Sequence, residues 1–167
     1  SSRSTSSYNS CPSLGMPSYF FYKMEIRYKQ VETINEFIDY IRLRVDVFIK
    51  EQKFESGWEP DEDDKISKHF IALADNKVVS TARFKEEKKG EFHIGRMTTK
   101  KEYRRKGIAK KLVGFMVNEI MKLKPKRIWL NSQVHAQKFY EKCGFNAVSE
   151  PFDIHGIPHV EMEYKVR

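Results

Sequence analysis

Alternation of apolar and polar residues along several short stretches of the chain predicts β-strands. The predicted strands are 24–29, 69–75, 77–87, 91–99, 126–132, 144–152 and 159–166. Those between residues 69 and 99 follow one another through short turns at Asp75-Asn76 and Lys89-Gly90, so we expect them to pair antiparallel.

Apolar residues that recur every three or four positions predict helices between these strands. Thr33 and Glu36 form the T-x-x-E pattern of a capping box, which predicts that the first helix begins there. The apolar positions of this helix are Ile34, Phe37, Ile38, Ile41, Val45 and Phe48. A second helix is predicted from about Gly107 to a stop before Pro125, and a third over 135–143. The order β-α-β-β-β-α-β-α-β-β predicts a mixed α/β sheet, neither a doubly wound fold nor a helix bundle.

Residues 1–23 differ from the rest of the chain in composition. The first eighteen include eight serines and no Asp or Glu. We expect this tail to be disordered or left over from expression, with a targeting segment as the second interpretation. The remainder, 24–167, is long enough for one domain with its own core.

Composition and charge narrow the class of protein. Of the 167 residues, 40% are hydrophobic and 32% charged, which is typical of a soluble globular protein. No apolar run approaches the roughly 20 residues that span a bilayer, so no membrane partner is expected. Cys11 and Cys143 give no disulfide framework, which favours a cytoplasmic location, and the absence of C-x-x-C predicts no metal site. The net charge of +8 favours an anionic partner, either nucleic acid or a phosphate-bearing ligand.

The stretch "EYRRKGIAKKL", 102–112, joins the end of a predicted strand to the start of the second helix. The first turn of a helix leaves backbone N–H groups unpaired at the positive end of its dipole, and such a turn binds phosphate. Neither the P-loop pattern nor the dinucleotide fingerprint is present. A helix that binds nucleic acid, and a merely solvated face, remain open from these residues alone.

The same stretch resembles the R/Q-x-x-G-x-G/A motif of the GNAT superfamily of acyl-CoA N-acyltransferases. Here the motif reads Arg104-Arg105-Lys106-Gly107-Ile108-Ala109. The segment "NSQVHAQKFYEKCGF" resembles the second GNAT motif, N-x-x-A-x-x-[LF]-Y-E-x-x-G-F. The resemblance covers about 24–167 and extends to a branch of small, single-domain, bacterial-type GNAT proteins. It departs from the family at Ala109, where the motif has a second glycine, and at Gln133, where the motif has asparagine.

The resemblance implies a GNAT fold whose central parallel strands, 93–99 and 126–132, splay apart around acetyl-CoA. It implies that this cosubstrate is bound by Met97, Thr98, Thr99, Arg104, Arg105, Lys106, Gly107, Ile108, Ala109 and Gln133. Main-chain groups of 97–99 would pair with the pantetheine arm, and backbone N–H groups from about Arg105 to Ala109 would hold the pyrophosphate without a metal.

The resemblance also implies an acid for the chemistry, because Tyr140 matches the tyrosine that donates a proton to the departing sulfur. A packing role for this tyrosine is the alternative. The base is left open among Glu51, His69, His93, His159 and a chain of water molecules, with Glu51 or His159 preferred. The acidic run over 59–64 either attracts a cationic amine or is a solvated loop.

The implied activity is transfer of an acetyl group from acetyl-CoA to a primary amine by direct attack in a ternary complex. The amine belongs to a small molecule or a protein that the sequence does not identify, and a longer acyl donor stays open. The alternatives are a basic nucleic-acid-binding module and a GNAT domain that binds CoA without catalysis. A homodimer is possible, because the last strands offer edges for pairing.

Overall fold

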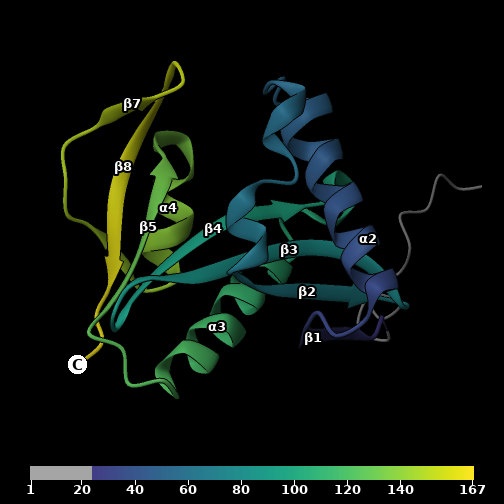
Figure 1. The fold of residues 1–167 in the computed structure, drawn as a ribbon, viewed down its shortest axis with the longest axis horizontal. Helices are drawn as coiled ribbons and strands as arrows, with labels where there is room; N and C mark the ends of the chain where they lie inside the picture. Colours follow the sequence, from purple (N-terminus) through teal and green to yellow (C-terminus); the bar gives the residue numbers. More distant parts are fainter. Residues whose placement is uncertain (1–23) are drawn as a thin grey trace, which may run out of the picture.

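The structure is a computed structural model that describes residues 24–167, so the expectations for 1–23 lie outside the described residues. Its centre is a sheet of eight strands in the order β1-β2-β3-β4-β5-β8-β6, with β7 paired to β8 (Figure 1). The strands are β1 (Ile26–Gln30), β2 (Lys68–Ala74), β3 (Lys77–Lys88), β4 (Glu91–Thr99), β5 (Arg127–Gln133), β6 (Phe145–Ala147), β7 (Phe152–Ile154) and β8 (Ile157–Tyr164).

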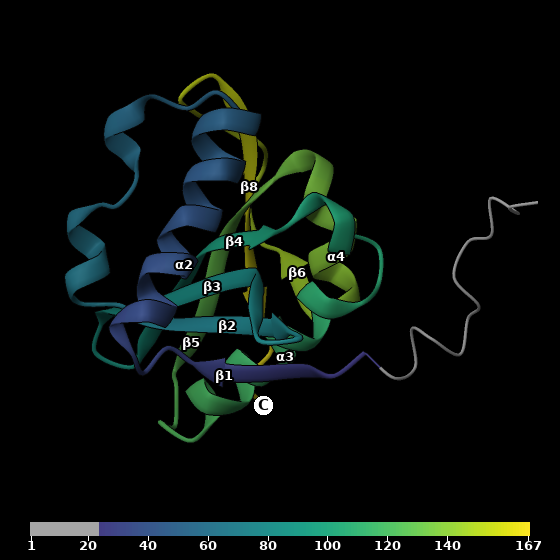
Figure 2. The ribbon, with the colours of Figure 1, turned by 90° about the vertical axis from the view of Figure 1, so that its right-hand side faces the viewer.

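Among residues 24–167, the α-helices that cover the sheet are α2 (Ile34–Arg44), α3 (Ile108–Met121) and α4 (Gln137–Lys142). Consecutive residues of β2 point to opposite faces of the sheet. Phe70 packs in the core that includes α3, and Ile71 packs with Tyr40 of α2. Figure 2 shows α2 and α3 on different sides of β1–β3. Within 24–167, none of the helices is both long and apolar enough to cross a bilayer.

The first helix begins as predicted, and Phe37 and Ile41 of the expected stripe pack against the core, but other residues of that stripe do not. Thr33 Oγ1 accepts the Glu36 N–H at 3.1 Å, and Glu36 Oε1 accepts the Thr33 N–H at 3.0 Å, which completes the capping box. Ile34 and Ile38, expected on the buried stripe, are 71% and 41% exposed. The buried residues are instead Tyr40, Leu43 and Arg44, because Arg44 pairs with buried carboxylates beneath the helix.

The chain then continues from α2 into a π-helix (Val45–Glu51). A π-helix has a wider turn than an α-helix, so a 3.6-residue period no longer describes which side chains share a face. Phe48, which the apolar period assigned to the buried stripe, lies half-buried in the wall of a cavity.

The mixed sheet and its order agree with the prediction, except near the end of the chain. The stretch 144–152, predicted as one strand, forms β6 and β7 with an irregular segment between them. Ser149 Oγ accepts the Glu161 N–H there at 2.9 Å, and Pro151 has no N–H to offer to a ladder.

The predicted splay of the central parallel strands is confirmed. β4 and β5 pair from Glu91 opposite Arg127 to Ile94 opposite Leu130, and then separate. A bulge at Arg96, where φ is +50°, keeps the rest of β4 paired with β3. β5 stays paired with β8, so the sheet divides into two halves, which Figure 1 shows as flat and upright groups of strands.

Candidate active site

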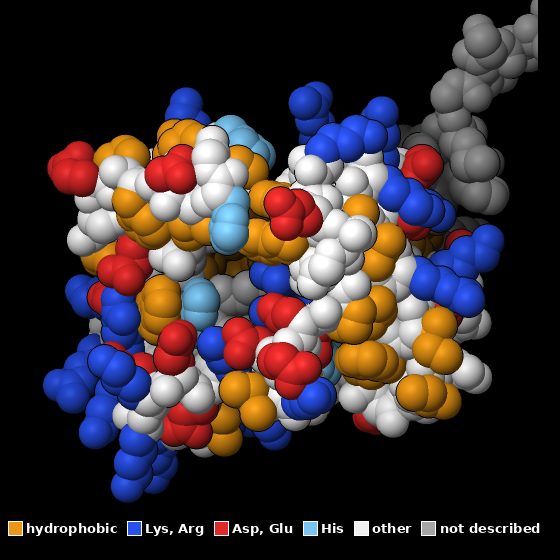
Figure 3. All heavy atoms as spheres, turned by 45° about the horizontal axis from the view of Figure 1, so that its top comes forward, with side chains coloured by type: hydrophobic (Ala, Val, Ile, Leu, Met, Phe, Trp, Pro, Cys, Tyr) orange, Lys and Arg blue, Asp and Glu red, His pale blue; other side chains and the backbone are white. Residues whose placement is uncertain are grey.

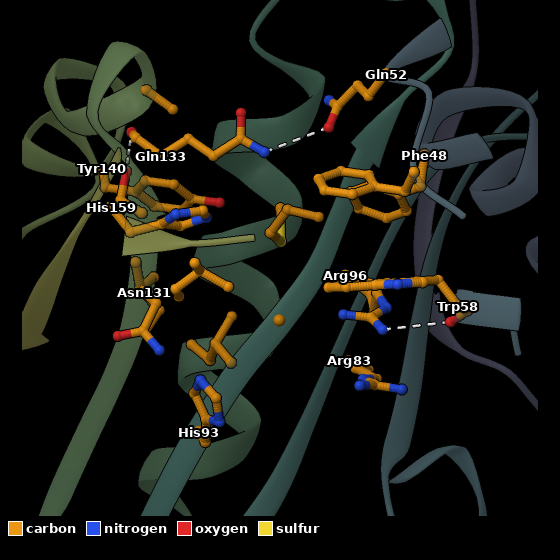
Figure 4. Close-up of a pocket in the computed structure, with 18 of the residues that line it drawn as sticks. Phe48, Gln52, Trp58, Arg83, His93, Arg96, Asn131, Gln133, Tyr140 and His159 are labelled. Atoms are coloured by element: carbon orange, nitrogen blue, oxygen red, sulfur yellow. Dashed lines mark hydrogen bonds between the residues drawn. The ribbon is translucent and has the colours of Figure 1, made fainter. Parts of the chain in front are cut away.

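The gap between the diverging ends of β4 and β5 opens into a cavity of about 320 Å³. Figure 3 shows a hollow on this face of the molecule, with hydrophobic side chains and histidines at its rim. One wall comes from the π-helix and the loop after it, including Phe48 and Trp58, and Tyr140 and His159 lie across from it (Figure 4). The cavity therefore brings one predicted acid and one predicted base together.

The start of α3 has the geometry that phosphate binding requires. Gly107 has φ +77° and precedes the helix without a side-chain cap, and the first helical bond runs from Lys111 N–H to Gly107 O at 3.1 Å. The N–H groups of Ile108, Ala109 and Lys110 therefore have no acceptor within the helix. A Cβ placed on Gly107 would meet nothing within 4 Å, so the space on this side of the helix start is open.

The main chain of 97–99 lies on the β4 side of the opening. Met97 lines the cavity, whereas the Thr98 side chain is buried against Thr81. The carbonyl of Thr98 accepts from Ser80 Oγ at 2.8 Å, and that of Thr99 accepts from Arg104 Nε at 2.9 Å. A ligand that donated hydrogen bonds to these two carbonyls would have to share them with Ser80 and Arg104.

The basic residues of the loop before α3 are arranged in different ways. Arg104 pairs with Glu51 at the end of the π-helix, with 2.8 Å between Nη2 and Oε2. Arg105 adopts a left-handed backbone with φ +62°, and the Lys106 ammonium lies 5.6 Å from the centre of the Tyr103 ring. Glu51 itself is exposed and does not line the cavity.

Tyr140 is held by aromatic neighbours on both sides. Its ring centre is 5.0 Å from that of Phe139 and 6.1 Å from that of Phe145. Burial raises the pKa of Tyr140 well above its usual value, so the phenol stays protonated at neutral pH. Its hydroxyl has no hydrogen-bond partner among the described residues and is therefore available to a ligand.

His159 is oriented by its own strand. Its Nδ1 lies 2.7 Å from the carbonyl oxygen of Ile157, and because a carbonyl only accepts, Nδ1 carries a proton in this bond. In the neutral ring Nε2 is then the acceptor. His159 pairs opposite Gln133 in the sheet and is nine-tenths buried, on the same side of the cavity as Tyr140 (Figure 4).

The other two histidines considered as bases differ from His159. Both ring nitrogens of His69 are engaged, with Tyr40 Oη at 2.8 Å and the Asp64 carbonyl at 2.9 Å, and this ring does not line the cavity. His93 does line it, stacked on Trp129 with ring centres 3.9 Å apart. Burial lowers the pKa of His93 to about 4 despite the nearby Glu87 carboxylate, so this imidazole is neutral at pH 7.

Neither expectation describes the whole acidic run, because Glu62 is exposed to solvent whereas Glu59, Asp61 and Asp64 are held in ion pairs with arginines. Glu59 pairs with Arg44, and Asp64 lies 2.7 Å from both Arg44 Nη1 and Arg83 Nη1. The side chains of Glu59 and Asp64 are only 1% and 6% exposed. The sequence pattern gave no sign of these pairs, since the arginines stand far from the carboxylates along the chain.

Gln133, the residue that replaces the motif asparagine, spans the opening above the cavity. Its Nε2 donates to Gln52 Oε1 at 3.3 Å (Figure 4). Its Oε1 lies 2.6 Å from His135 Nε2. Gln133 therefore lies at the opening of the cavity, and its side chain is already engaged by two polar partners.

Several lining residues were missed by sequence reasoning. Trp58 stands in a polar loop, and an isolated large aromatic there was the one available signal. Gly95 and Arg96 lie on β4 at the bulge, which no residue pattern predicts. Cys143 is half-buried, and burial raises its pKa to about 11.

Comparison with known proteins identifies the family. The family model described as "Acetyltransferase (GNAT) domain" matches residues 26–166. A UPF0039 protein of Synechocystis is 32% identical over 130 residues, covering 75% of this chain and 84% of that protein. The crystal structure of Escherichia coli ElaA has a TM-score of 0.76 at 23% identity and covers 84% of this chain and 100% of that one.

A Bacillus anthracis acetyltransferase, solved in complex with acetyl coenzyme A, has a TM-score of 0.64 at 18% identity, covering 84% of this chain and 98% of that one. At this identity the similarity shows a common fold. The match of the family model over almost all of 24–167 goes further, and the chain therefore belongs to the GNAT acetyltransferases, enzymes that use acyl-CoA.

Proposed function

We propose that this enzyme transfers the acetyl group of acetyl-CoA to a primary amine by direct attack within a ternary complex. The observation that carries the proposal is the cavity in the split sheet, which has Tyr140 and His159 on one side. The uncapped start of α3 supplies N–H donors for a pyrophosphate next to the same split. In this proposal α3 serves phosphate binding, and Tyr140 and His159 serve proton transfer.

In this proposal the CoA portion lies along β4, from Met97 to Thr99, with its pyrophosphate on the N–H groups of 105–109. Gly107 keeps the approach open, since no side chain projects there. The positive end of the α3 dipole and the basic residues around it favour the phosphates, and a metal is not required for their charge. Gln133 would reach the CoA arm after giving up its bond to Gln52.

The chemistry forms one bond and breaks one. The neutral amine nitrogen attacks the thioester carbonyl carbon, a C–N bond forms, and the C–S bond breaks with its electron pair remaining on sulfur. His159 Nε2 accepts the proton that the nitrogen loses, and the Tyr140 hydroxyl donates a proton to the sulfur. The products are the acetylated amine and CoA thiol, after which His159 releases its extra proton to solvent and Tyr140 takes one up.

We assign the base to His159 rather than Glu51. His159 lines the cavity with Nε2 as its acceptor, whereas Glu51 is held by Arg104 outside the lining. This favours a tethering role for Glu51.

The test has two parts that separate binding from catalysis. Acetyl-CoA at 100 times its Kd should stabilise the protein by about 2.7 kcal/mol, which raises the melting temperature. Release of CoA thiol with a panel of amines then measures transfer, and Tyr140→Phe should lower it. No stabilisation at millimolar acetyl-CoA would refute the proposal, while stabilisation without transfer to any amine would leave a domain that binds CoA without catalysis.

A further inference from the structure

We propose that the acceptor is an arylalkylamine, a primary amine on a short chain attached to a flat aromatic ring. The ring would pack against an aromatic wall formed by Phe48, Phe54 and Trp58. This inference rests on the proposed function, because it names the substrate class of the same cavity.

The aromatic wall is a cluster separate from the core. Phe54 and Trp58 are stacked, with ring centres 5.0 Å apart and an angle of 21° between planes, and Phe48 lies 6.1 Å from Phe54. All three side chains are half-buried, and none belongs to the hydrophobic clusters that hold the sheet and helices together. Apolar rings that the core does not use, and that border a cavity, are suited to an apolar ligand.

The wall faces the proposed chemistry across open space. Phe48 and Trp58 lie on one side of the cavity, and Tyr140 and His159 on the other (Figure 4). Gly95 lines the cavity as well, and a Cβ at this position would meet nothing within 4 Å. A ligand that extends across the cavity can therefore place its ring on the wall and its amine beside His159.

The charges near the wall disfavour a polycationic acceptor. The Arg96 guanidinium lies 5.7 Å from the ring centre of Phe48 and 5.8 Å from that of Trp58, so a cation already faces the aromatic wall. Asp61, which could attract a second cation, is paired with Arg83 and with Arg96. A neutral ring meets neither a repelling charge nor an unpaired carboxylate there, and edge-to-face contact with the rings of the wall adds to the apolar contact.

The first experiment compares amines of matched size. We measure kcat/KM with 2-phenylethylamine, 2-cyclohexylethylamine, hexylamine and spermidine at saturating acetyl-CoA. The expected result is an advantage of about tenfold for 2-phenylethylamine over hexylamine, the magnitude of a good aromatic contact. Equal values for these two amines, or a preference for spermidine, would overturn the inference while the proposed function stands.

The second experiment changes the wall. Trp58→Leu keeps apolar volume but removes the stacking surface, and should reduce the advantage of 2-phenylethylamine to less than about threefold without changing the stabilisation by acetyl-CoA. Phe152→Leu is the matched control, because Phe152 is 38% exposed on β7 and does not line the cavity. A variant Trp58→Leu that weakens all four amines equally would show a structural role for Trp58 and refute the inference.

Binding without turnover keeps the inference separate from the proposed function. Calorimetry of 2-phenylethylamine with the CoA-saturated protein should show tighter binding than hexylamine, and Trp58→Leu should remove the difference. If CoA binds and the ring preference appears without acetyl transfer, the binding site is supported and the catalytic proposal fails. If CoA binds but no ring preference appears, the inference fails.

Discussion

The carboxylate of Glu51 forms an ion pair with the guanidinium of Arg104, with 2.8 Å between Nη2 and Oε2. Arg104 also donates to the Thr99 carbonyl at 2.9 Å, so one side chain connects the end of the π-helix to the end of β4. A residue considered as the catalytic base is thus joined to the first residue of the phosphate-binding motif. This arrangement favours Glu51 as a tether between two segments.

Replacing Glu51 by Gln should therefore leave catalysis nearly intact. We expect kcat within about threefold of the wild-type value and a pH–rate profile of unchanged shape, because no proton of the reaction passes through this group. The loss of an exposed ion pair costs less than about 1 kcal/mol of stability. A pH profile that loses its acidic limb in Glu51→Gln would instead identify Glu51 as the base.

His159→Ala should have the opposite effect. Removing a general base typically lowers the rate by about 10²–10⁴-fold, and we expect this loss in kcat with little change in the KM for acetyl-CoA. The rate of the variant should rise with pH, because the amine must then lose its proton to solvent. Steady-state kinetics between pH 6 and 10 measure both effects, and His69→Ala is the control, since that ring lies outside the cavity lining.

Tyr140→Phe should lower kcat by about 100-fold and leave the fold intact. The phenylalanine ring can keep the contacts with Phe139 and Phe145, so the melting temperature should change little. Burial raises the pKa of Tyr140, and the wild-type rate should therefore show no decline from tyrosine ionisation up to pH 10. A wild-type rate that declines well below pH 10 and a variant that does not would contradict the environment described for this side chain.

Two glycines of the α3 region provide a matched pair of tests for the phosphate cradle. Gly107→Val places a branched side chain at φ +77°, which is strained, and in front of the unpaired N–H groups. The stabilisation by acetyl-CoA should disappear in this variant. Gly114→Ala lies at an exposed position inside α3, where it should raise stability by up to about 1 kcal/mol and keep the response to acetyl-CoA.

One result for Gly107→Val would contradict the proposed phosphate cradle. The melting temperature of each variant with and without acetyl-CoA separates lost binding from lost stability. A Gly107→Val protein that is still stabilised by acetyl-CoA to the wild-type extent would show that the pyrophosphate binds elsewhere.

The buried ion pairs predict how stability depends on pH. Burial opposes ionisation of Asp64, but the hydrogen bonds and charges of Arg44 and Arg83 outweigh it and hold its pKa well below the usual value. A carboxyl with a depressed folded-state pKa stabilises the fold above its unfolded pKa of about 3.9, and this stabilisation is lost as pH falls through the folded value. The pKa of Glu36, in the capping box, is lowered to about 2 and contributes in the same direction. Burial raises the pKa of Glu59, which partly offsets the effect.

The free energy of unfolding should thus begin to decline as pH falls below the unfolded pKa of histidine, about 6.5, because the folded pKa of His93 is lowered to about 4, and should decline more steeply below about pH 4, where the paired carboxylates become protonated. Asp64→Asn should cost about 3–5 kcal/mol at pH 7, because it leaves buried guanidinium groups without their partner. Its stability should also decline less steeply in acid. Urea unfolding of the wild-type protein and of Asp64→Asn between pH 7 and 2.5 measures both effects. An equally steep decline in the stability of Asp64→Asn would mean that other carboxyls control the acid transition.

Features that depend on neighbouring residues could be predicted from the sequence. The capping box at Thr33 and the glycine at the start of α3 are both local patterns, and both are present in the structure. The strands could be predicted because alternation is a property of single segments. The motif around Gly107 was found for the same reason.

Features that depend on contacts between distant residues could not be predicted from the sequence. Phe48 was assigned to a buried stripe because the 3.6-residue period does not hold in a π-helix. The bulge at Arg96 is set by pairing with β3. The hydrogen bonds of Arg44 to Glu59 and Asp64 join residues that are 15 and 20 positions apart along the chain. The aromatic wall depends both on the π-helix, which places Phe48, and on contacts between separate segments. Its position at the cavity could therefore not be predicted from the sequence.

The short ladder between β4 and β5 has a mechanical consequence. Within the described residues, the pairing from Glu91–Arg127 to Ile94–Leu130 is the strand ladder that links the two halves of the sheet, so this ladder can act as a hinge. A ligand that lies between the free ends of these strands would bridge the halves beyond the hinge and limit their relative rotation. Occupancy of the cleft should therefore slow amide hydrogen exchange on both strands together, including residues that no ligand atom touches.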